Sequence, residues 1–491
     1  MKKKLSLLVC LLLLAQSVTG CSESTQDTQT DTDTTAVTEA ETLSPAEEAL
    51  AAKNAYFEAL PAISAPGTEI TFIANFEDIA VEELTGDRYN DAVFNRNLDI
   101  EQRLDVKIVT DFDENHKVAQ IVTNNVTSGD AAHDLVDTTT TEVAKLLLKG
   151  CLMDMDTVSN MQLDKEWWNQ SANNAFTLQG FRYCVMSALN HQSDTVAHFI
   201  LVNKNLCEDY GMDVPYDAVL EGTWTYDLMY EMACQLPYDS NGDGSMDQYD
   251  IAGIMGGKSF IDYAMMSGGV DYFIKDENDI PVFSLLNEQN VSYYDHLFNI
   301  FSDADHVLYY NNLVNVDSKW GWFVNKYAAG EGLFLLTGPV GLLDYVEMED
   351  DYGILPMAKI DVNQESYRTM TSFTFTTCIS IPKVYKADPA DMGIVLDAMS
   401  YLSHVDVRDV YVNSYLESRW VRDEESVKMV RLALDNIYFD PSFVMYEQWG
   451  NPTDIGSAVL ATGTNTLVST VRSRENAIKA AVQKTLDQMD S

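Results

Sequence analysis

Apolar residues follow two different spacings in the first third of the chain. Continuous apolar and β-branched runs at 69–75 and 106–110 are typical of buried strands. By contrast, Val118 and Ile121 recur at helical spacing, and Gly129 ends that pattern. The predicted elements are strands at 69–75, 106–110 and 134–137 and helices at 45–60, 89–104, 118–128, 142–149 and 464–490. Strands that alternate with helices at this distance predict βαβ units and a mostly parallel sheet.

Polar residues follow two of these strands. Parallel sheets place their ligand sites beyond the carboxyl ends of the strands, so these residues are candidates for ligand contacts. The alternative role for each is a helix cap or a loop position. The residues that we expect to bind a ligand are Asn75, Phe76, Asp137 and Thr138, followed by Thr139 and Thr140.

The N-terminus resembles a bacterial lipoprotein signal. Three lysines precede an apolar run that is too short to span a bilayer as a mature helix. Val18-Thr-Gly-Cys21 resembles the lipobox, which predicts a signal peptide over 1–20 and a diacylated Cys21 that anchors the mature chain to a membrane. A plain cleaved signal is the alternative. We expect residues 21–66 to form an acidic, Thr-rich disordered tether and a short helix, which opens with a capping box from Ser44 to Glu47.

Composition narrows the class of protein. The 491 residues include 31 Lys and Arg against 76 Asp and Glu, a formal net charge of -45, and 46% are hydrophobic. The apolar content excludes global disorder, and the length predicts two or three compact units. The acidity speaks against nucleic acid and against a basic lipid-binding patch. Five cysteines beyond Cys21 show no metal-ligand spacing, and we expect buried residues, with one disulfide left open.

A run of aspartates and glycines has the spacing of a calcium loop. Carboxylate and amide oxygens fall at loop positions 1, 3, 5, 9 and 12, and Gly244 falls at position 6, where such a loop turns. The last position holds Asp in place of Glu, which resembles dockerin loops, although a single repeat speaks against cohesin binding. The alternative is a solvated turn without metal. The predicted ligands of a structural Ca²⁺ are Asp239, Asn241, Asp243, Ser245 through its carbonyl, Asp247 and Asp250.

The sequence lacks the motifs of the common catalytic sites. It contains no GxSxG elbow, no HExxH helix, no P-loop and no GxGxxG fingerprint, and its seven histidines are scattered. We therefore expect a protein that is not an enzyme. A carboxylate pair of the glycosidase type stays open as an alternative, because acidic residues are so abundant.

Several short motifs, in order along residues 67–400, resemble the extracellular solute-binding proteins of ABC importers, of the carbohydrate-binding type that includes maltose-binding protein. The motifs are Ser128-Gly-Asp130, His133-Asp-Leu-Val-Asp137, Lys149-Gly-Cys-Leu-Met-Asp154, Phe199-Ile-Leu-Val-Asn-Lys204, Gly222-Thr-Trp-Thr225, Ser267-Gly-Gly269, Thr337-Gly-Pro339 and Asp351-Tyr-Gly-Ile-Leu-Pro356.

The resemblance implies a periplasmic-binding-protein-like α/β fold of type II. In this fold two α/β lobes are joined by a multi-strand hinge, and the ligand lies in a cleft between them. We expect the chain to cross between the lobes near 190–198, 374–380 and 440. The expected N-lobe is 67–190 with 378–440, and the expected C-lobe is 191–377 with 441–491.

Sugar sites combine aromatic platforms with polar groups. The candidates are Trp167, Trp168, Phe260, Trp320 and Trp449, with Trp322, Tyr446 and the cation Arg368. The resemblance implies that Phe260 and Trp449 occupy positions of cleft aromatics. The family's Gly-Pro-Trp appears here as Gly338-Pro-Val340, which removes one platform and puts a maltose-like ligand in doubt. We expect Trp224 in the core.

The resulting hypothesis is a lipid-anchored monomer on the extracellular face of a bacterial cytoplasmic membrane. It would capture a sugar or oligosaccharide by closing its cleft and present it to the permease of an ABC importer. Two alternatives stay open. One is a surface glycan-adhesion or scaffold lipoprotein without a transporter, and the other is a binding protein for a peptide, polyol or uronate.

Overall fold

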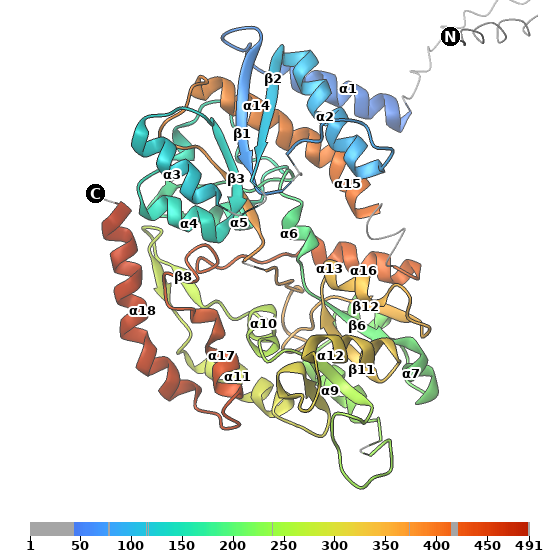
Figure 1. Cartoon of the computed structure of the whole chain (residues 1–491). Coiled ribbons are helices and arrows are strands. Elements are labelled where there is room, and N and C mark those ends of the chain that lie inside the picture. The colour runs from blue at the N-terminus through green and yellow to red at the C-terminus, as the bar shows by residue number, and fades with distance from the viewer. Residues whose placement is uncertain are drawn as a thin grey trace, which may run out of the picture. The chain divides into compact units, whose positions relative to one another are not determined.

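The computed structural model describes residues 44–76, 79–113, 115, 117–237, 239–372, 374–413 and 421–489 (Figure 1). The chain divides into two compact units, residues 1–55 and 56–491. The predicted signal peptide, Cys21 and the tether up to residue 43 lie outside the described residues. None of the helices in the described ranges combines the length and the apolar character that crossing a membrane requires.

The first helix, α1 (Pro45–Ala59), begins with the predicted capping box. The Ser44 N–H donates to Glu47 Oε2 at 2.8 Å, and the Glu47 N–H donates back to Ser44 Oγ at 3.4 Å. This reciprocal pair satisfies amide groups that the first helical turn leaves without an intrahelical partner.

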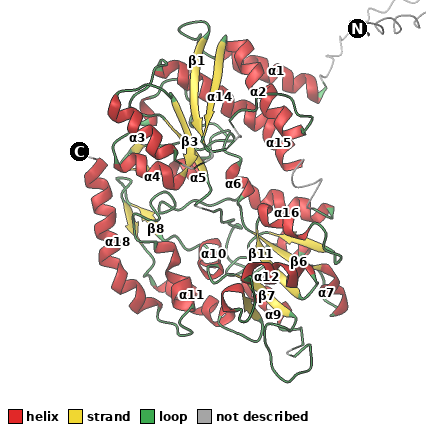
Figure 2. Ribbon diagram, viewed as in Figure 1, coloured by secondary structure: helices red, strands yellow, loops and turns green. Residues whose placement is uncertain are grey.

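A four-stranded sheet organises the first lobe, in the order β13-β3-β1-β2. Its paired strands β1 and β3 are labelled in Figure 2. Strand β1 is parallel to β2 and to β3, whereas β13 is antiparallel to β3. The strands are β1 (Thr68–Ala74), β2 (Val106–Phe112), β3 (Leu135–Thr139) and β13 (Thr377–Ser380). The helices around them are α2 (Arg88–Leu104), α3 (Val118–Ser128), α4 (Thr140–Leu148), α14 (Pro389–Leu402), the π-helix η4 (Ser403–Val407) and α15 (Arg408–Tyr411). The predicted alternation of strands and helices is confirmed here.

The two faces of this sheet bury different helices, because successive strand residues point to opposite sides. Ile70 and Phe72 belong to a core cluster that includes residues of α2 and α14. Ile73 belongs to the cluster that includes residues of α3 and α4. Helix α3 ends at Gly129, which adopts φ 73° and supplies the left-handed cap that the sequence predicts.

A five-stranded sheet organises the second lobe, in the order β10-β7-β11-β6-β12. Strand β7 is parallel to β10 and β11, and β6 is antiparallel to β11 and β12. The strands are β6 (Phe199–Asn203), β7 (Ala252–Gly256), β10 (Val307–Tyr309), β11 (Gly332–Thr337) and β12 (Tyr352–Leu355). The helices are α7 (Lys204–Asp209), α8 (Tyr216–Leu220), α9 (Tyr226–Ala233), α10 (Phe260–Ser267), α11 (Glu288–Phe301), η2 (Tyr310–Asn312), α12 (Lys319–Ala328), α13 (Pro339–Leu342), η3 (Leu343–Tyr345), α16 (Glu424–Leu434), η6 (Pro452–Asp454) and α17 (Ile455–Leu460).

Shorter elements lie between and beside the sheets. They are η1 (Met155–Thr157), α5 (Gln170–Ala175), α6 (Gln192–Thr195) and two hairpins, β4 (Thr177–Leu178) with β5 (Phe181–Arg182) and β8 (Phe273–Lys275) with β9 (Pro281–Phe283). The last helix, α18 (Leu467–Met489), confirms the predicted C-terminal helix, and it contacts β9 and α4.

Three chain segments run side by side between the sheets. The His198 N–H donates to the Met370 carbonyl at 2.7 Å, and the Ser372 N–H donates to the Val196 carbonyl at 3.1 Å. On the other side, the Thr369 N–H donates to the Asn436 carbonyl at 2.8 Å. These contacts tie segments 196–198, 369–372 and 436–438 to one another, close to two of the positions where we expect the chain to cross between the lobes.

The lobe boundaries stay a prediction, and one observation bears on them. Helix α16 lies inside the range 378–440, which we expected in the first lobe. It packs against β12 and α8 of the second lobe. The chain therefore reaches the second lobe before α16 begins, and segment 436–438 follows as a hinge segment.

Candidate functional site

Polar residues at the carboxyl ends of β1 and β3 come together as the sheet topology predicts. The Thr138 hydroxyl donates to Asn75 Oδ1, and the Asn190 side chain donates to Asp137 Oδ1 at 2.9 Å. Asn75, Asp137 and Thr138 are all buried, while Phe76 is half-buried. In this structure the buried polar groups of the cluster satisfy one another, so any ligand would have to exchange with these bonds.

The tryptophan pair Trp167 and Trp168 lies in the core of the first lobe. Both indole N–H groups donate to Asp397 Oδ1, at 3.1 and 3.0 Å. Trp168 is 1% exposed and Trp167 is 8% exposed. Their faces pack against protein, so neither offers an open platform to a solute in this structure.

Two further aromatic candidates are also core residues. Trp449 is buried, donates from its indole to Thr485 Oγ1 at 3.1 Å and packs on Phe273 at 4.8 Å between ring centroids. Phe260 is buried and packs on Phe301, with 5.0 Å between the ring centroids. Trp224 is buried as well, which confirms the expectation that it belongs to the core.

Two further candidates, Arg368 and Trp320, keep some exposure, and Trp322 and Tyr446 are partly buried. Arg368 forms an ion pair with Asp271 at 2.7 Å, and its guanidinium lies 4.6 Å from the ring centre of Tyr438. Trp320 is 49% exposed, and its ring meets Tyr310 edge to face at 5.6 Å. Of the predicted platforms, Trp320 therefore has the most open surface.

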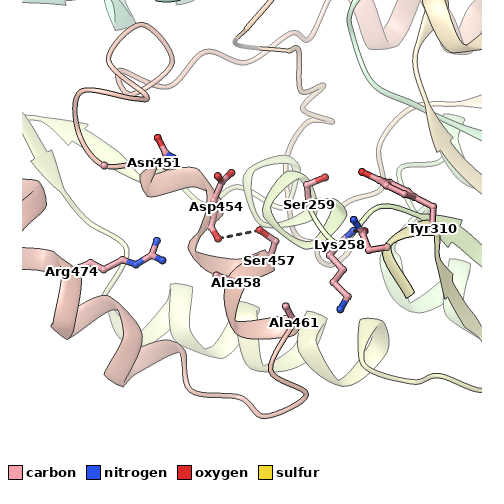
Figure 3. Close-up of a pocket in the computed structure, with 11 residues that line it drawn as sticks. Lys258, Ser259, Tyr310, Asn451, Asp454, Ser457, Ala458, Ala461 and Arg474 are labelled. Carbon is pink, nitrogen blue, oxygen red and sulfur yellow. Dashed lines mark hydrogen bonds between the residues drawn. The ribbon is translucent and has the colours of Figure 1, made fainter. Parts of the chain in front are cut away.

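A pocket of about 580 Å³ lies in the second lobe, where α10, α17 and α18 approach η2 (Figure 3). Figure 3 shows Arg474 on one side of α17 and Lys258 with Tyr310 on the other. The residues that line the pocket are Lys258, Ser259, Tyr310, Asn311, Gly450, Asn451, Asp454, Ser457, Ala458, Ala461 and Arg474. It adjoins two predicted residues, because Phe260 follows Ser259 and Trp320 packs on Tyr310.

A buried carboxylate fixes the wall of this pocket. Asp262 of α10 accepts hydrogen bonds from the Gly456 and Ser457 N–H groups at 2.7 and 2.8 Å and from the Tyr272 hydroxyl at 2.9 Å. These bonds hold the first turn of α17 against α10. Burial raises the pKa of Asp262 to about 7, although the three donors favour its charged form.

In the predicted calcium loop, carboxylate oxygens accept hydrogen bonds from the N–H groups of the loop's own backbone. Asp239 accepts from the Gly242, Asp243 and Gly244 N–H groups, and the buried Asp250 accepts from Ser240, Asn241 and Asp247. Across the described ranges, no group of three or more His, Cys, Asp or Glu side chains converges to hold a metal ion. Calcium binding to this loop stays a prediction.

Cysteines confirm part of the sequence analysis. Cys151, Cys184, Cys207 and Cys378 are buried, whereas Cys234 is exposed. All five are unpaired in the described part of the chain. Burial also raises the pKa of the Cys207 thiol to about 11, as expected for a cysteine that serves as a small apolar residue.

No protein-family model and no curated protein sequence matches this chain. Solved structures do match. The cyclic α-maltosyl-1,6-maltose binding protein from Arthrobacter globiformis is 13% identical with a TM-score of 0.59, over 85% of this chain and 99% of that one. A cyclo/maltodextrin-binding protein complexed with maltotetraose is 13% identical with a TM-score of 0.57, over 86% and 98%. The maltose-binding protein MalE from Listeria monocytogenes is 14% identical with a TM-score of 0.56, over 85% and 98%.

These likenesses establish the fold. Over most of its length the chain has the α/β fold of maltose-binding-protein-like, type II periplasmic binding proteins. Each of the three structures is named as a binding protein and none as an enzyme. At this level of identity the ligand of this chain is a matter for its own residues.

Sequence reasoning did not find Lys258, Asn451 and Arg474. They lie on three segments far apart in the chain, and none belongs to a motif. One signal was present: in a chain with 31 Lys and Arg against 76 Asp and Glu, each isolated cation is a rare residue.

Proposed function

We propose that the protein is an extracellular solute-binding protein that captures a saccharide and presents it to an ABC importer. The observation that carries the proposal is the type II fold, shared over about 85% of the chain with several saccharide-binding proteins. The pocket in the second lobe supports it, because hydroxyl, amide and aromatic side chains line it together. These groups suit the polar rim and the apolar face of a sugar ring.

Capture would use the hinge. Three backbone segments connect the lobes, and small dihedral changes in them can rotate one lobe toward the other. A saccharide that contacts both lobes only in the closed form would stabilise that form. The permease would then recognise the closed state. No covalent chemistry is needed in this proposal.

The lipid anchor is a separate part of the proposal. The lipobox-like Val18-Thr-Gly-Cys21 supports it, and a diacylated Cys21 would hold the protein at the outer face of the membrane. Mass spectrometry of the protein isolated from its native membrane tests it. A mature N-terminal residue Cys21 with added acyl mass is the expected result, and an unmodified N-terminus elsewhere contradicts it.

A thermal-shift screen of residues 22–491 tests the proposed function. The panel contains neutral mono- and oligosaccharides, uronates, polyols and peptides. A ligand at about 100 times its dissociation constant stabilises the native state by about 2.7 kcal/mol, a shift of a few degrees for a protein of this size. A selective shift by one saccharide class supports the proposal, whereas a shift by peptides alone contradicts saccharide capture.

A further inference from the structure

The pocket in the second lobe carries an unusual balance of charge. Two cations, Lys258 and Arg474, and a single carboxylate, Asp454, line it. Over the whole chain, acidic residues outnumber basic ones by 76 to 31. The pocket therefore reverses the charge ratio of the protein that surrounds it.

The two cations are held in the pocket without an acidic partner. Among the described residues, no carboxylate lies within ion-pair distance of the Lys258 amine or the Arg474 guanidinium, and both side chains are half-buried. The Lys258 backbone is fixed, since its N–H donates to Asn311 Oδ1 at 2.9 Å. Arg474 projects from α18 toward α17 (Figure 3). Partly buried cations gain most from a partner that brings the opposite charge.

The one carboxylate of the pocket is already engaged. Tyr446 donates its hydroxyl to Asp454 Oδ2, and the raised pKa of that phenol, caused first by burial and then by Asp454, keeps it a donor. Among the described residues, Asp454 forms no ion pair with Lys258 or Arg474, and its single negative charge leaves the two cations in excess.

Between the cations lies a surface of small side chains. Asp454, Ser457, Ala458 and Ala461 follow the spacing of one helical face, and none of them is large. Beside Lys258 stands the ring of Tyr310, backed by the half-exposed Trp320. A sugar ring can lie against Tyr310 while a charged substituent reaches Lys258 or Arg474.

From this geometry we propose that the captured solute is an acidic saccharide, one whose sugar rings carry carboxylate groups that pair with Lys258 and Arg474. The inference rests on the proposed function and names the substrate class of its pocket. Arg474 supplies a planar fork suited to a carboxylate, and Lys258 supplies a point charge. The surrounding hydroxyl and amide groups, from Ser259, Asn311, Asn451 and Ser457, remain for the sugar hydroxyls.

Calorimetric titration with two matched probes tests the proposal. Trigalacturonate carries carboxylates, and its methyl ester has the same rings without the charge. We expect trigalacturonate to bind at least about tenfold more tightly than the ester, since one charge-assisted pair is worth about 1.5 kcal/mol or more. Added salt should weaken the binding of trigalacturonate, because it screens the charge pairs, and should leave the affinity for the ester unchanged.

Charge-removing variants locate the effect. Lys258→Gln and Arg474→Gln should each weaken binding of trigalacturonate about tenfold, and should weaken binding of the ester by a smaller factor. Arg472→Gln is the matched control, because Arg472 lies on the same helix, is exposed and does not line the pocket. Circular dichroism confirms that each variant is folded.

The outcomes separate the two proposals. If neutral saccharides bind while the acid has no advantage and both variants behave as the native protein, the charge inference is wrong and saccharide capture stands. Binding of acetate or inorganic phosphate that matches trigalacturonate would also overturn the inference, since the sugar would then contribute nothing. If no saccharide of either kind binds the folded protein, both proposals fail.

Discussion

Buried carboxylates organise much of the interior of this acidic protein. Asp397 lies at the centre of the first lobe's aromatic cluster, and Asp262 and Asp440 hold backbone turns in the second lobe. Each accepts several hydrogen bonds, which satisfy its buried oxygen atoms. Two of the tryptophans that the sequence singles out as sugar platforms, Trp167 and Trp168, are oriented by Asp397.

Replacing Asp397 tests this role. Its carboxylate accepts from the indoles of Trp167 and Trp168, from the Gln162 N–H at 2.9 Å and from the Tyr56 hydroxyl at 2.7 Å. Asp397→Ala leaves these donors without an acceptor, and we expect the free energy of unfolding to fall by about 3 kcal/mol. Urea denaturation of the native protein and of the variant measures this change in the free energy of unfolding.

The exposed Asp409 provides the control for that experiment. Its side chain is 77% exposed, with one long ion pair to Arg431 at 3.7 Å. We expect Asp409→Ala to change the free energy of unfolding by less than about 0.5 kcal/mol. Equal effects of the two substitutions would contradict the organising role of Asp397.

The pKa of Asp262 gives stability a pH dependence. Burial raises the pKa of this carboxyl to about 7 in the native state, whereas an unfolded aspartate has a pKa of about 3.9. The native state therefore binds the proton more tightly, and the stability from this group is lost as the pH rises from about 4 through 7. We expect the loss to reach about 4 kcal/mol at most.

Denaturation of the native protein and of Asp262→Asn across this range isolates the effect. Other carboxylates contribute equally to both proteins. The stability of the native protein relative to the variant should decrease as the pH rises. Parallel pH profiles would show that Asp262 has an ordinary pKa.

Residue roles were the hardest feature to predict from the sequence. Asn75, Asp137 and Thr138 could be placed together, because the ends of parallel strands meet at one edge of a sheet. The burial of Trp449 could not be predicted, because it depends on contacts with Thr485 and Phe273, which lie far away in the sequence. A side chain becomes core or platform through such distant contacts.

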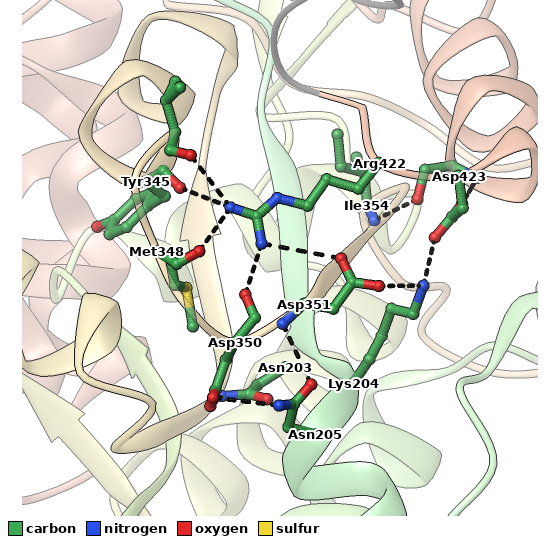
Figure 4. A network of polar contacts seen from close by, with 12 residues as sticks. Asn203, Lys204, Asn205, Tyr345, Met348, Asp350, Asp351, Ile354, Arg422 and Asp423 are labelled. Atoms are coloured by element: carbon green, nitrogen blue, oxygen red, sulfur yellow. Dashed lines mark hydrogen bonds and ion pairs between the residues drawn. The ribbon is translucent and has the colours of Figure 1, made fainter.

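At the scale of elements, a single arginine joins several segments of the second lobe (Figure 4). The Arg422 guanidinium donates to the carbonyls of Asp350 at 2.6 Å, Met348 at 2.9 Å and Tyr345 at 3.2 Å. It also lies 4.3 Å from the ring centre of Tyr352 in β12. The planar fork of arginine reaches these acceptors at once, which the single amine of lysine cannot do.

Arg422→Lys tests this clamp, because it keeps the charge and removes the fork. We expect the free energy of unfolding to fall by about 2 kcal/mol as carbonyl groups lose their donors. The same substitution at Arg431, which is 43% exposed in its side chain, is the control and should have little effect. If both variants unfold at the same urea concentration as the native protein, the network does not stabilise the lobe.

The aspartate-rich loop yields another prediction at this scale. If Asp239, Asp243 and Asp247 turn inward to bind Ca²⁺, added calcium should raise the melting temperature and a chelator should lower it. Asp243→Ala should abolish the difference. Identical melting curves with calcium and with chelator would show that the loop is a metal-free turn.

Elements were predicted best where the spacing of apolar residues is regular. Strands β1 to β3 and helices α2 to α4 lie where the sequence indicates, and Gly129 ends α3 as expected. The antiparallel position of β6 in the second sheet was beyond sequence reasoning, since it depends on which strands pair. Helix α16 was expected in the first lobe, whereas it packs on β12 and α8 of the second lobe. The apolar face of a helix shows that it packs against something, but not against which element.

At the scale of the whole molecule, the type II fold explains how a pocket and a hinge can act together. Residues 196–198, 369–372 and 436–438, which hydrogen bonds join, are the segments that we propose as the hinge, and the pocket lies within the second lobe. The fold could be predicted from ordered motifs in the sequence. The pocket could not, because α10, α17 and α18 assemble it only in three dimensions.

The most direct test of saccharide capture is calorimetric titration of residues 22–491 with the saccharide that produces the largest thermal shift. We expect saturable binding of one saccharide per protein chain, with a negative heat-capacity change as the sugar and the lobes bury apolar surface. The absence of heat across the saccharide panel, for a protein that circular dichroism shows to be folded, would contradict it.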